Sequence, residues 1–242
     1  MRTALLLLAD SRLPAGAHAH SGGLEPAVQA GSVRDVADLA GFLRARGRAA
    51  GLVSGALAAA SCGHAAAVAA GAAARWRELD REAEVRMPSA AQRQAARAQG
   101  RALLRAGRAA WRHPVLDGLA EALPAGPAHP VSLGACVFAA GGDPHDAALI
   151  TATAAITGPA SAAVRLLGLD PLAVHKLLAD LAADTDAIAA EAAQASGAGG
   201  LGGSAPQVSR APDWAGLPAM SAPGLDMLAE RHLRTDGRLF ES

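Results

Sequence analysis

No stretch of this chain alternates apolar and polar residues in the way that a half-buried β-strand requires. Residues that favour strands are also scarce, since aromatic residues make up 2% of the chain and tyrosine is missing. The hydrophobic fraction is nevertheless 51%, much of it alanine, a strong helix former whose small side chain lets helices pack closely. A length of 242 residues is enough for one large domain with a buried core. We therefore predict an all-α fold, a single domain of about eight to ten helices.

Changes in composition divide the chain into three parts. Residues 1–196 have the pattern of consecutive helices, with breaks expected at Cys62 and Gly63 and again at Gly158 and Pro159. Residues 197–222 are rich in Gly, Ser, Pro and Ala, which predicts a flexible segment. Residues 223–242 are expected to form a short helix and a tail. The tail carries apolar side chains where polar ones are usual, which is typical of a docking peptide that binds its own domain or another protein.

Two uncharged stretches, residues 55–74 and 147–164, are long enough to cross a membrane. Both lack the density of Leu, Ile and Phe that drives insertion, so we expect buried helices of a soluble bundle and no membrane partner. The apolar run near the N-terminus ends at Asp10, too early for a secretory signal, which favours a cytoplasmic location. The two cysteines, Cys62 and Cys136, are expected to be small buried residues with reduced thiols.

The segment Leu13-Pro14-Ala15-Gly16-Ala17-His18-Ala19-His20-Ser21-Gly22-Gly23-Leu24-Glu25 cannot continue a helix, because its Pro and Gly residues break one. We expect an ordered loop that exposes His18, His20 and Ser21 and leads into a helix at Leu24 and Glu25. His18 and His20 could bind a metal through their imidazoles, but two ligands alone bind weakly. Loop histidines hydrogen-bonded to backbone are the favoured interpretation.

Sequence motifs of the common enzyme classes are missing. Lys176 is the only lysine and follows His175 rather than Gly, which excludes a P-loop. The chain has no Gly-x-Ser-x-Gly elbow and no His-Glu-x-x-His helix. His20 and Ser21 are neighbours whose side chains rarely face each other productively. We predict a protein that is not an enzyme and uses no cofactor.

Six arginines spaced three or four apart make one stripe on a predicted helix: Arg93, Arg97, Arg101, Arg105, Arg108 and Arg112. Like charges at this spacing repel, so an anionic group is expected against them. One interpretation is an intramolecular partner, which the last long helix could supply through Asp180, Asp184, Asp186 and Glu191. A second is an acidic patch on another protein. A third, nucleic acid, ranks last because aromatic residues for stacking are few and 22 basic residues balance 22 acidic ones.

Segments at both ends of the chain resemble those of the urease accessory protein UreF family. The N-terminal segments are Leu13-Pro14-x-Gly16, His20-Ser21-x-Gly23-Leu24-Glu25 and Gly31-x-Val33-x-Asp35. The C-terminal ones are Pro223-x-Leu225-Asp226, His232 and Arg238-Leu239-Phe240-x-Ser242. Internal segments of the family are similar to Gly100-x-x-Leu103-Leu104 and to residues 161–166. The resemblance spans nearly the whole chain.

This resemblance implies an all-α assembly factor that dimerises, binds UreD (also called UreH) and recruits the GTPase UreG. That assembly delivers nickel to the urease apoprotein, and the family protein couples the GTP cycle of UreG to activation. The same resemblance implies that hydrogen bonds of His20, Ser21 and Glu25 order the loop and that Arg165 affects UreG. The implied partner-binding residues are Gly16, His20, Ser21, Gly23, Leu24, Glu25, Arg165, His232, Arg238, Leu239, Phe240 and Ser242.

Two alternatives from other classes stay open at the level of sequence. One is a helical nickel-binding metallochaperone that uses His18 and His20. The other, less favoured, is a basic helical nucleic-acid binder that uses the arginine stripe. Urease maturation remains the leading prediction, without nucleic acid as a partner.

Overall fold

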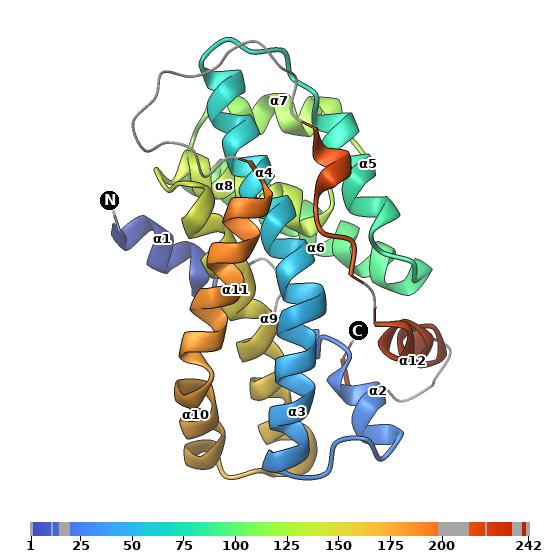
Figure 1. Ribbon diagram of the computed structural model, residues 1–242. Helices are drawn as coiled ribbons and strands as arrows, with labels where there is room; N and C mark the ends of the chain where they lie inside the picture. Colours follow the sequence, from blue (N-terminus) through green and yellow to red (C-terminus); the bar gives the residue numbers. More distant parts are fainter. Residues whose placement is uncertain are drawn as a thin grey trace.

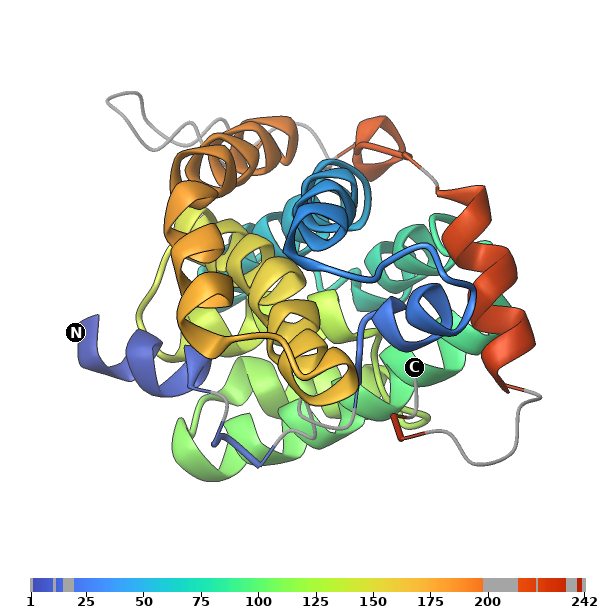
Figure 2. The same cartoon turned by 90° about the horizontal axis from the view of Figure 1, so that it is seen from below.

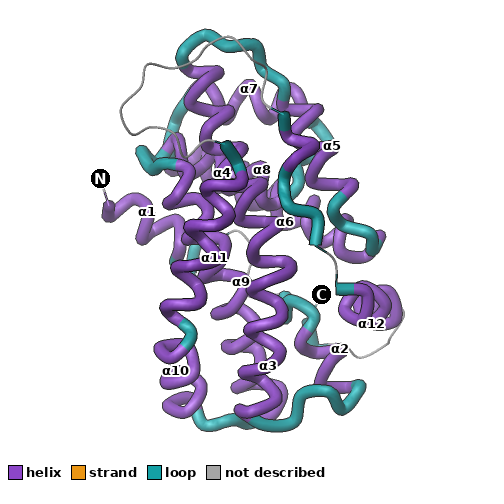
Figure 3. The backbone as a smooth tube through the Cα atoms, viewed as in Figure 1, coloured by secondary structure: helices purple, strands orange, loops and turns teal. Residues whose placement is uncertain are grey.

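The computed structural model of the protein describes residues 2–10, 12–14, 20–197, 213–220, 222–233 and 239–240. All regular structure in these ranges is helical, which confirms the all-α prediction (Figure 3). The α-helices are α1 (Arg2–Ala9), α2 (Leu24–Gln29), α3 (Val36–Arg46), α4 (Leu52–Ala69), α5 (Trp76–Val85), α6 (Ala90–Ala110), α7 (Pro114–Ala122), α8 (His129–Ala139), α9 (Pro144–Leu167), α10 (Pro171–Asp180), α11 (Ala182–Ala195) and α12 (Pro223–Leu233). A π-helical segment, η2 (Gly47–Gly51), and a short 3₁₀ turn, η3 (Trp214–Gly216), complete the set.

The axis of the molecule is a continuous rod formed by α3, η2 and α4 (Figure 1). Helices α9 and α11 lie along this rod and α8 packs across α4 (Figures 1 and 2). Close packing here depends on small residues: a Cβ on Gly134 of α8 would lie 2.1 Å from the carbonyl oxygen of Ala58 in α4. The small side chains of this alanine-rich chain therefore allow the backbones of neighbouring helices to pack very close together.

Three helix boundaries differ from the prediction. The rod does not break at Cys62 and Gly63 but continues to Ala69, because Cys62 is buried and packing on α8 outweighs the low helix propensity of glycine. Helix α9 likewise continues through Pro159, where Arg46 donates a hydrogen bond to the carbonyl oxygen that the proline leaves free. The last long helix is instead two, α10 and α11, because the chain turns at Leu181.

Buried apolar side chains form two clusters. The larger one centres on α4 and α8 and includes Trp214 and Leu217, which lie within residues 197–222, the segment predicted to be flexible. The smaller one joins α2, α3, α9 and α10, and it includes Phe240 from the tail. Cys62 and Cys136 are both free and buried, as predicted, and burial raises the pKa of each thiol to about 12.

Two helical spans have the length and composition of membrane helices, residues 36–69 and 144–167. In the apolar windows of these spans, 67% and 50% of the residues respectively are buried inside the protein. Both spans pack against other helices of the bundle.

Candidate functional site

The loop that precedes α2 turns sharply at two glycines. Gly22 and Gly23 adopt φ of +64° and +87°, a region that side chains with a Cβ rarely enter. The prediction that the loop exposes Ser21 was wrong: this side chain is buried, and its Oγ accepts a hydrogen bond of 3.1 Å from the backbone N–H of Glu25. Leu24 is buried in the smaller cluster, and His20 is half-buried. The predicted residues Gly16 and His18 lie outside the described residues.

Glu25 joins this loop to the tail of the chain. Its carboxylate is buried and accepts two backbone hydrogen bonds of 2.8 Å, one from the N–H of Leu239 and one from the N–H of Phe240. Charge-assisted hydrogen bonds of this kind are among the stronger ones in proteins. Two segments more than 200 residues apart are therefore fixed to each other by a single side chain.

His232 of α12 completes the contact. The side chain is buried, and its Nε2 lies 3.1 Å from the carbonyl oxygen of Phe240 and 3.5 Å from Oε2 of Glu25. Because both neighbours are acceptors, Nε2 carries the proton. We name the set of Glu25, His232, Leu239 and Phe240 the clasp.

The two tail residues of the clasp face different surroundings. Phe240 is only 3% exposed and packs in the smaller cluster, where the guanidinium of Arg165 lies 4.7 Å from its ring centroid. This geometry allows a cation–π interaction. Leu239 is 64% exposed. The tail therefore binds its own domain through Phe240 and presents Leu239 to the outside.

The structure brings together most of the residues that the sequence predicted for the two ends. Glu25 contacts Leu239, Phe240 and His232, and Arg165 lies over the Phe240 ring. Ser21 bonds the backbone of Glu25, and Leu24 shares the smaller cluster with Phe240. Gly23 lies near α12, since a Cβ there would be 3.9 Å from a methyl group of Leu225. Arg238 and Ser242 lie outside the described residues.

One neighbour of the loop carried no sequence signal. The guanidinium of Arg46 packs on Gly22, where a Cβ would lie 3.0 Å from Nη2. Burial lowers the pKa of Arg46 to about 10, so the side chain stays charged near neutral pH. Arg46 is one of several arginines near the end of α3, and only the fold shows which of them faces the loop.

A metal site does not emerge in the part of the chain that the structure describes. No group of three or more His, Cys, Asp or Glu side chains gathers there in a way that could hold an ion. Of the two predicted ligands, His20 is described and His18 lies outside the described residues.

The arginine stripe lies on α6 except for Arg112, which follows the end of the helix. Several of its members have intramolecular partners, but not the predicted ones. Arg97 pairs with Asp80 at 2.8 Å and with Glu84 at 2.6 Å, and Arg108 pairs with Asp117 at 2.7 Å. Arg93 and Arg101 donate to backbone carbonyls instead.

The prediction that α10 and α11 supply the acids was wrong, because α6 packs on α7, α8 and α12. The acids of α10 and α11 pair with other cations. Asp184 lies 3.8 Å from Arg44, Glu191 lies 3.4 Å from Arg48, and Asp180 pairs with Lys176.

Comparison with known proteins agrees with the family resemblance. A family model described as UreF matches residues 33–182. A protein named urease accessory protein UreF from Mycolicibacterium vanbaalenii is 40% identical over 238 residues, which cover 98% of this chain and 97% of that protein. Proteins of the same name from Mycobacterium marinum and Mycobacterium sp. (strain JLS) are each 41% identical and cover 98% and 99% of this chain, and 97% and 98% of their own lengths. The chain therefore belongs to the UreF family of urease accessory proteins.

Proposed function

We propose that this protein is a non-enzymatic scaffold for urease maturation, which bridges UreD (UreH) and the GTPase UreG and regulates GTP-dependent insertion of nickel into apo-urease. Family membership supports the general role, since the relatives are named as urease accessory proteins. The observation that carries the proposal is the clasp, because it brings together the N-terminal and C-terminal segments that resemble those of the family.

The exposed side of the clasp is the proposed contact for UreD. Leu239 is exposed there, and α12 adds two exposed apolar side chains, Met227 and Leu233. Each such side chain, when buried against a partner, would contribute about 1.5–3 kcal/mol to the free energy of binding. Phe240 is buried and therefore does not form part of this contact surface.

Arg165 is the proposed link to UreG. Its guanidinium is exposed on one side and stacks on the Phe240 ring on the other, so a partner that contacts Arg165 would sense the position of the tail. We further propose that the protein acts as a homodimer in the cytoplasm and binds no nucleic acid. Light scattering on the purified protein tests the dimer, and a monomer at working concentration would contradict it.

The experiment that tests the function is complementation in a strain that makes urease but lacks this protein. Wild-type protein is expected to restore both urease activity and the nickel content of purified urease. Leu239→Asp is expected to lower both, because it places a charge on the proposed UreD contact while leaving the buried side of the clasp intact. Full nickel loading in the strain without any copy of the protein would overturn the proposal.

A further inference from the structure

The described residues beyond position 212 are attached to the domain at more places than the clasp. We call the described residues 213–220, 222–233 and 239–240 the C-terminal arm. The arm begins at η3, crosses the end of α5, continues into α12 and ends in the clasp (Figures 1 and 2). The start of the arm is fixed by hydrogen bonds and buried side chains, as its end is.

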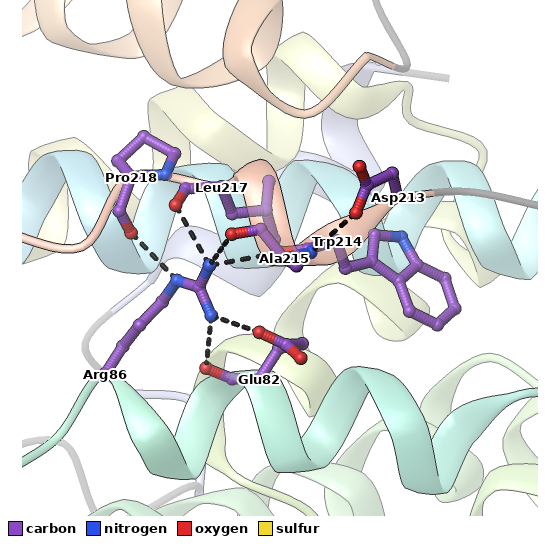
Figure 4. Close-up of polar contacts among 7 residues, drawn as sticks. All are labelled: Glu82, Arg86, Asp213, Trp214, Ala215, Leu217 and Pro218. Atoms are coloured by element: carbon purple, nitrogen blue, oxygen red, sulfur yellow. Dashed lines mark hydrogen bonds and ion pairs between the residues drawn. The ribbon is translucent and has the colours of Figure 1, made fainter.

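Arg86, the residue that ends α5, binds the start of the arm through backbone carbonyls (Figure 4). Its Nε donates to Pro218 at 2.9 Å, and its Nη2 donates to Ala215 and Leu217 at 2.9 Å and to Trp214 at 3.1 Å. Nη1 bonds the carbonyl oxygen and the carboxylate of Glu82, one turn earlier in α5. The Arg86 side chain is only 4% exposed, so this cation depends on these acceptors.

Trp214 and Leu217 anchor the same stretch from their apolar side. Both are buried in the larger cluster. The Trp214 ring meets the ring of His64 edge-on at 5.1 Å, and the guanidinium of Arg75 lies 5.1 Å from the Trp214 ring centroid. The arm thus starts from a fixed point despite the Gly-rich composition that precedes it.

A second attachment lies at the N-terminus of α6. This helix has no acidic residue in its first turn. Glu230 of α12 supplies one: its Oε1 accepts from Ser89 Oγ at 2.6 Å and from the backbone N–H of Ala91 at 3.0 Å. A carboxylate in this position bonds a free helix N–H and faces the positive end of the helix dipole.

Arg86 and Ser89 are three residues apart in the turn that joins α5 to α6. Both attachments are therefore made by one corner of the domain, residues 82–92, which holds η3 on one side and α12 on the other. Since His232 of α12 itself contacts Phe240, the place at which the corner holds α12 affects the clasp.

We infer that this α5–α6 corner is a docking site for the C-terminal arm, and that Arg86 and Glu230 are positioning residues that keep the clasp closed from a distance. At this site the guanidinium of Arg86 binds carbonyl groups of the arm backbone, and the N-terminus of α6 binds the carboxylate of Glu230. With the proposed function, which this inference extends, the corner would control whether the Leu239 surface is presented to UreD.

The test is hydrogen–deuterium exchange of the isolated full-length protein, without any other protein present. Arg86→Met removes every hydrogen bond that this side chain donates to the arm, and we expect the amides of Leu239 and Phe240 to exchange at least tenfold faster. Arg81→Met is the matched control, since Arg81 is an exposed arginine of the same helix, and it should leave these amides unchanged. Equal protection of the Leu239 and Phe240 amides in Arg86→Met and the wild type would overturn the inference.

Glu230→Ala provides a second route that spares the larger cluster, in case Arg86→Met does not fold. It is expected to speed exchange at Leu239 and Phe240, whereas Glu121→Ala, at an exposed glutamate of α7, should not. Unchanged exchange in Glu230→Ala would also contradict the inference. Because no urease protein takes part, a failure here is separate from a failure of the proposed function, which the complementation experiment reports.

Discussion

Arg46 donates a hydrogen bond from Nε to the carbonyl oxygen of Ala155, 3.1 Å away, in α9. In a regular helix this carbonyl would accept from the N–H four residues later, but that residue is Pro159 and has none. The guanidinium thus substitutes for the missing backbone donor. It also packs on Gly22, so one side chain connects the rod, α9 and the loop before α2.

This relationship predicts coupling between positions 46 and 159. Arg46→Met should lower the free energy of unfolding by about 1–3 kcal/mol, because it leaves the Ala155 carbonyl oxygen unpaired in a packed region. In a Pro159→Ala background the same change should be less costly, since the substituted alanine supplies the N–H itself. Urea unfolding of the four proteins in this cycle measures the difference. An equal cost of Arg46→Met in both backgrounds would contradict the assignment.

Glu25→Gln should weaken the clasp. A carboxylate offers an acceptor to each of the two tail amides, whereas a carboxamide offers one acceptor and turns its NH₂ group toward the other amide. We expect a loss of about 2 kcal/mol in unfolding free energy and loss of protection of one tail amide in NMR exchange measurements. Glu191→Gln, at an exposed ion pair with Arg48, is the control and should change stability by less than about 0.5 kcal/mol.

Replacement by alanine should affect stability at Phe240 and partner binding at Leu239. Phe240→Ala removes a buried ring and is expected to cost about 3–5 kcal/mol of unfolding free energy. Leu239→Ala removes an exposed side chain and should change stability by less than about 0.5 kcal/mol, while it weakens capture of UreD in a pull-down. A large stability loss from Leu239→Ala, or undiminished capture of UreD, would show that the two faces are misassigned.

Acidification should destabilise the protein through His64. Burial, with a smaller contribution from Arg75, lowers the pKa of His64 to about 4, and its Nε2 accepts a hydrogen bond from the Arg75 backbone N–H. The unfolded chain has the ordinary histidine pKa of about 6.5. Between these values the unfolded state binds the extra proton, so stability is full above about pH 6.5 and falls as the pH drops toward about 4.

Thermal unfolding between about pH 7.5 and 4.5 measures this effect. His64→Gln should flatten the decline, whereas His145→Gln, at an exposed position, should not. Some decline will remain in His64→Gln, because burial also lowers the pKa of His129 to about 4. An identical pH dependence in His64→Gln and the wild type would exclude His64 as a source.

Helices that begin and end on strong local signals could be predicted from the sequence. Ser89 caps α6, and His113 followed by Pro114 begins α7, so both helices start at residues that favour a helix N-terminus. The errors at Gly63 and Pro159 arose where a distant part of the chain decides the outcome. Packing on α8 and a hydrogen bond from α3 overrode residues that would break an isolated helix.

The same distinction applies to the site. Motif resemblance named Glu25, His232 and Phe240, but no local pattern showed that a carboxylate near one end would bind backbone amides near the other. Arg46, Arg86 and Glu230 had no signal at all, because arginine and glutamate are common on exposed helix faces. Their roles follow from the backbone carbonyls and the helix N-terminus that the fold places opposite them.

The hydrogen bond between Glu25 and Phe240 joins residues 215 positions apart. Contacts so distant in sequence form late in folding, after the local helical hairpins, because the entropy of closing a large loop must first be offset. Because Glu25 holds Leu239 in place, the surface that Leu239 forms with α12 exists only on a molecule whose folding is complete. A partner that recognises both elements together would pass over immature chains, so the clasp would act as a checkpoint on the scaffold itself.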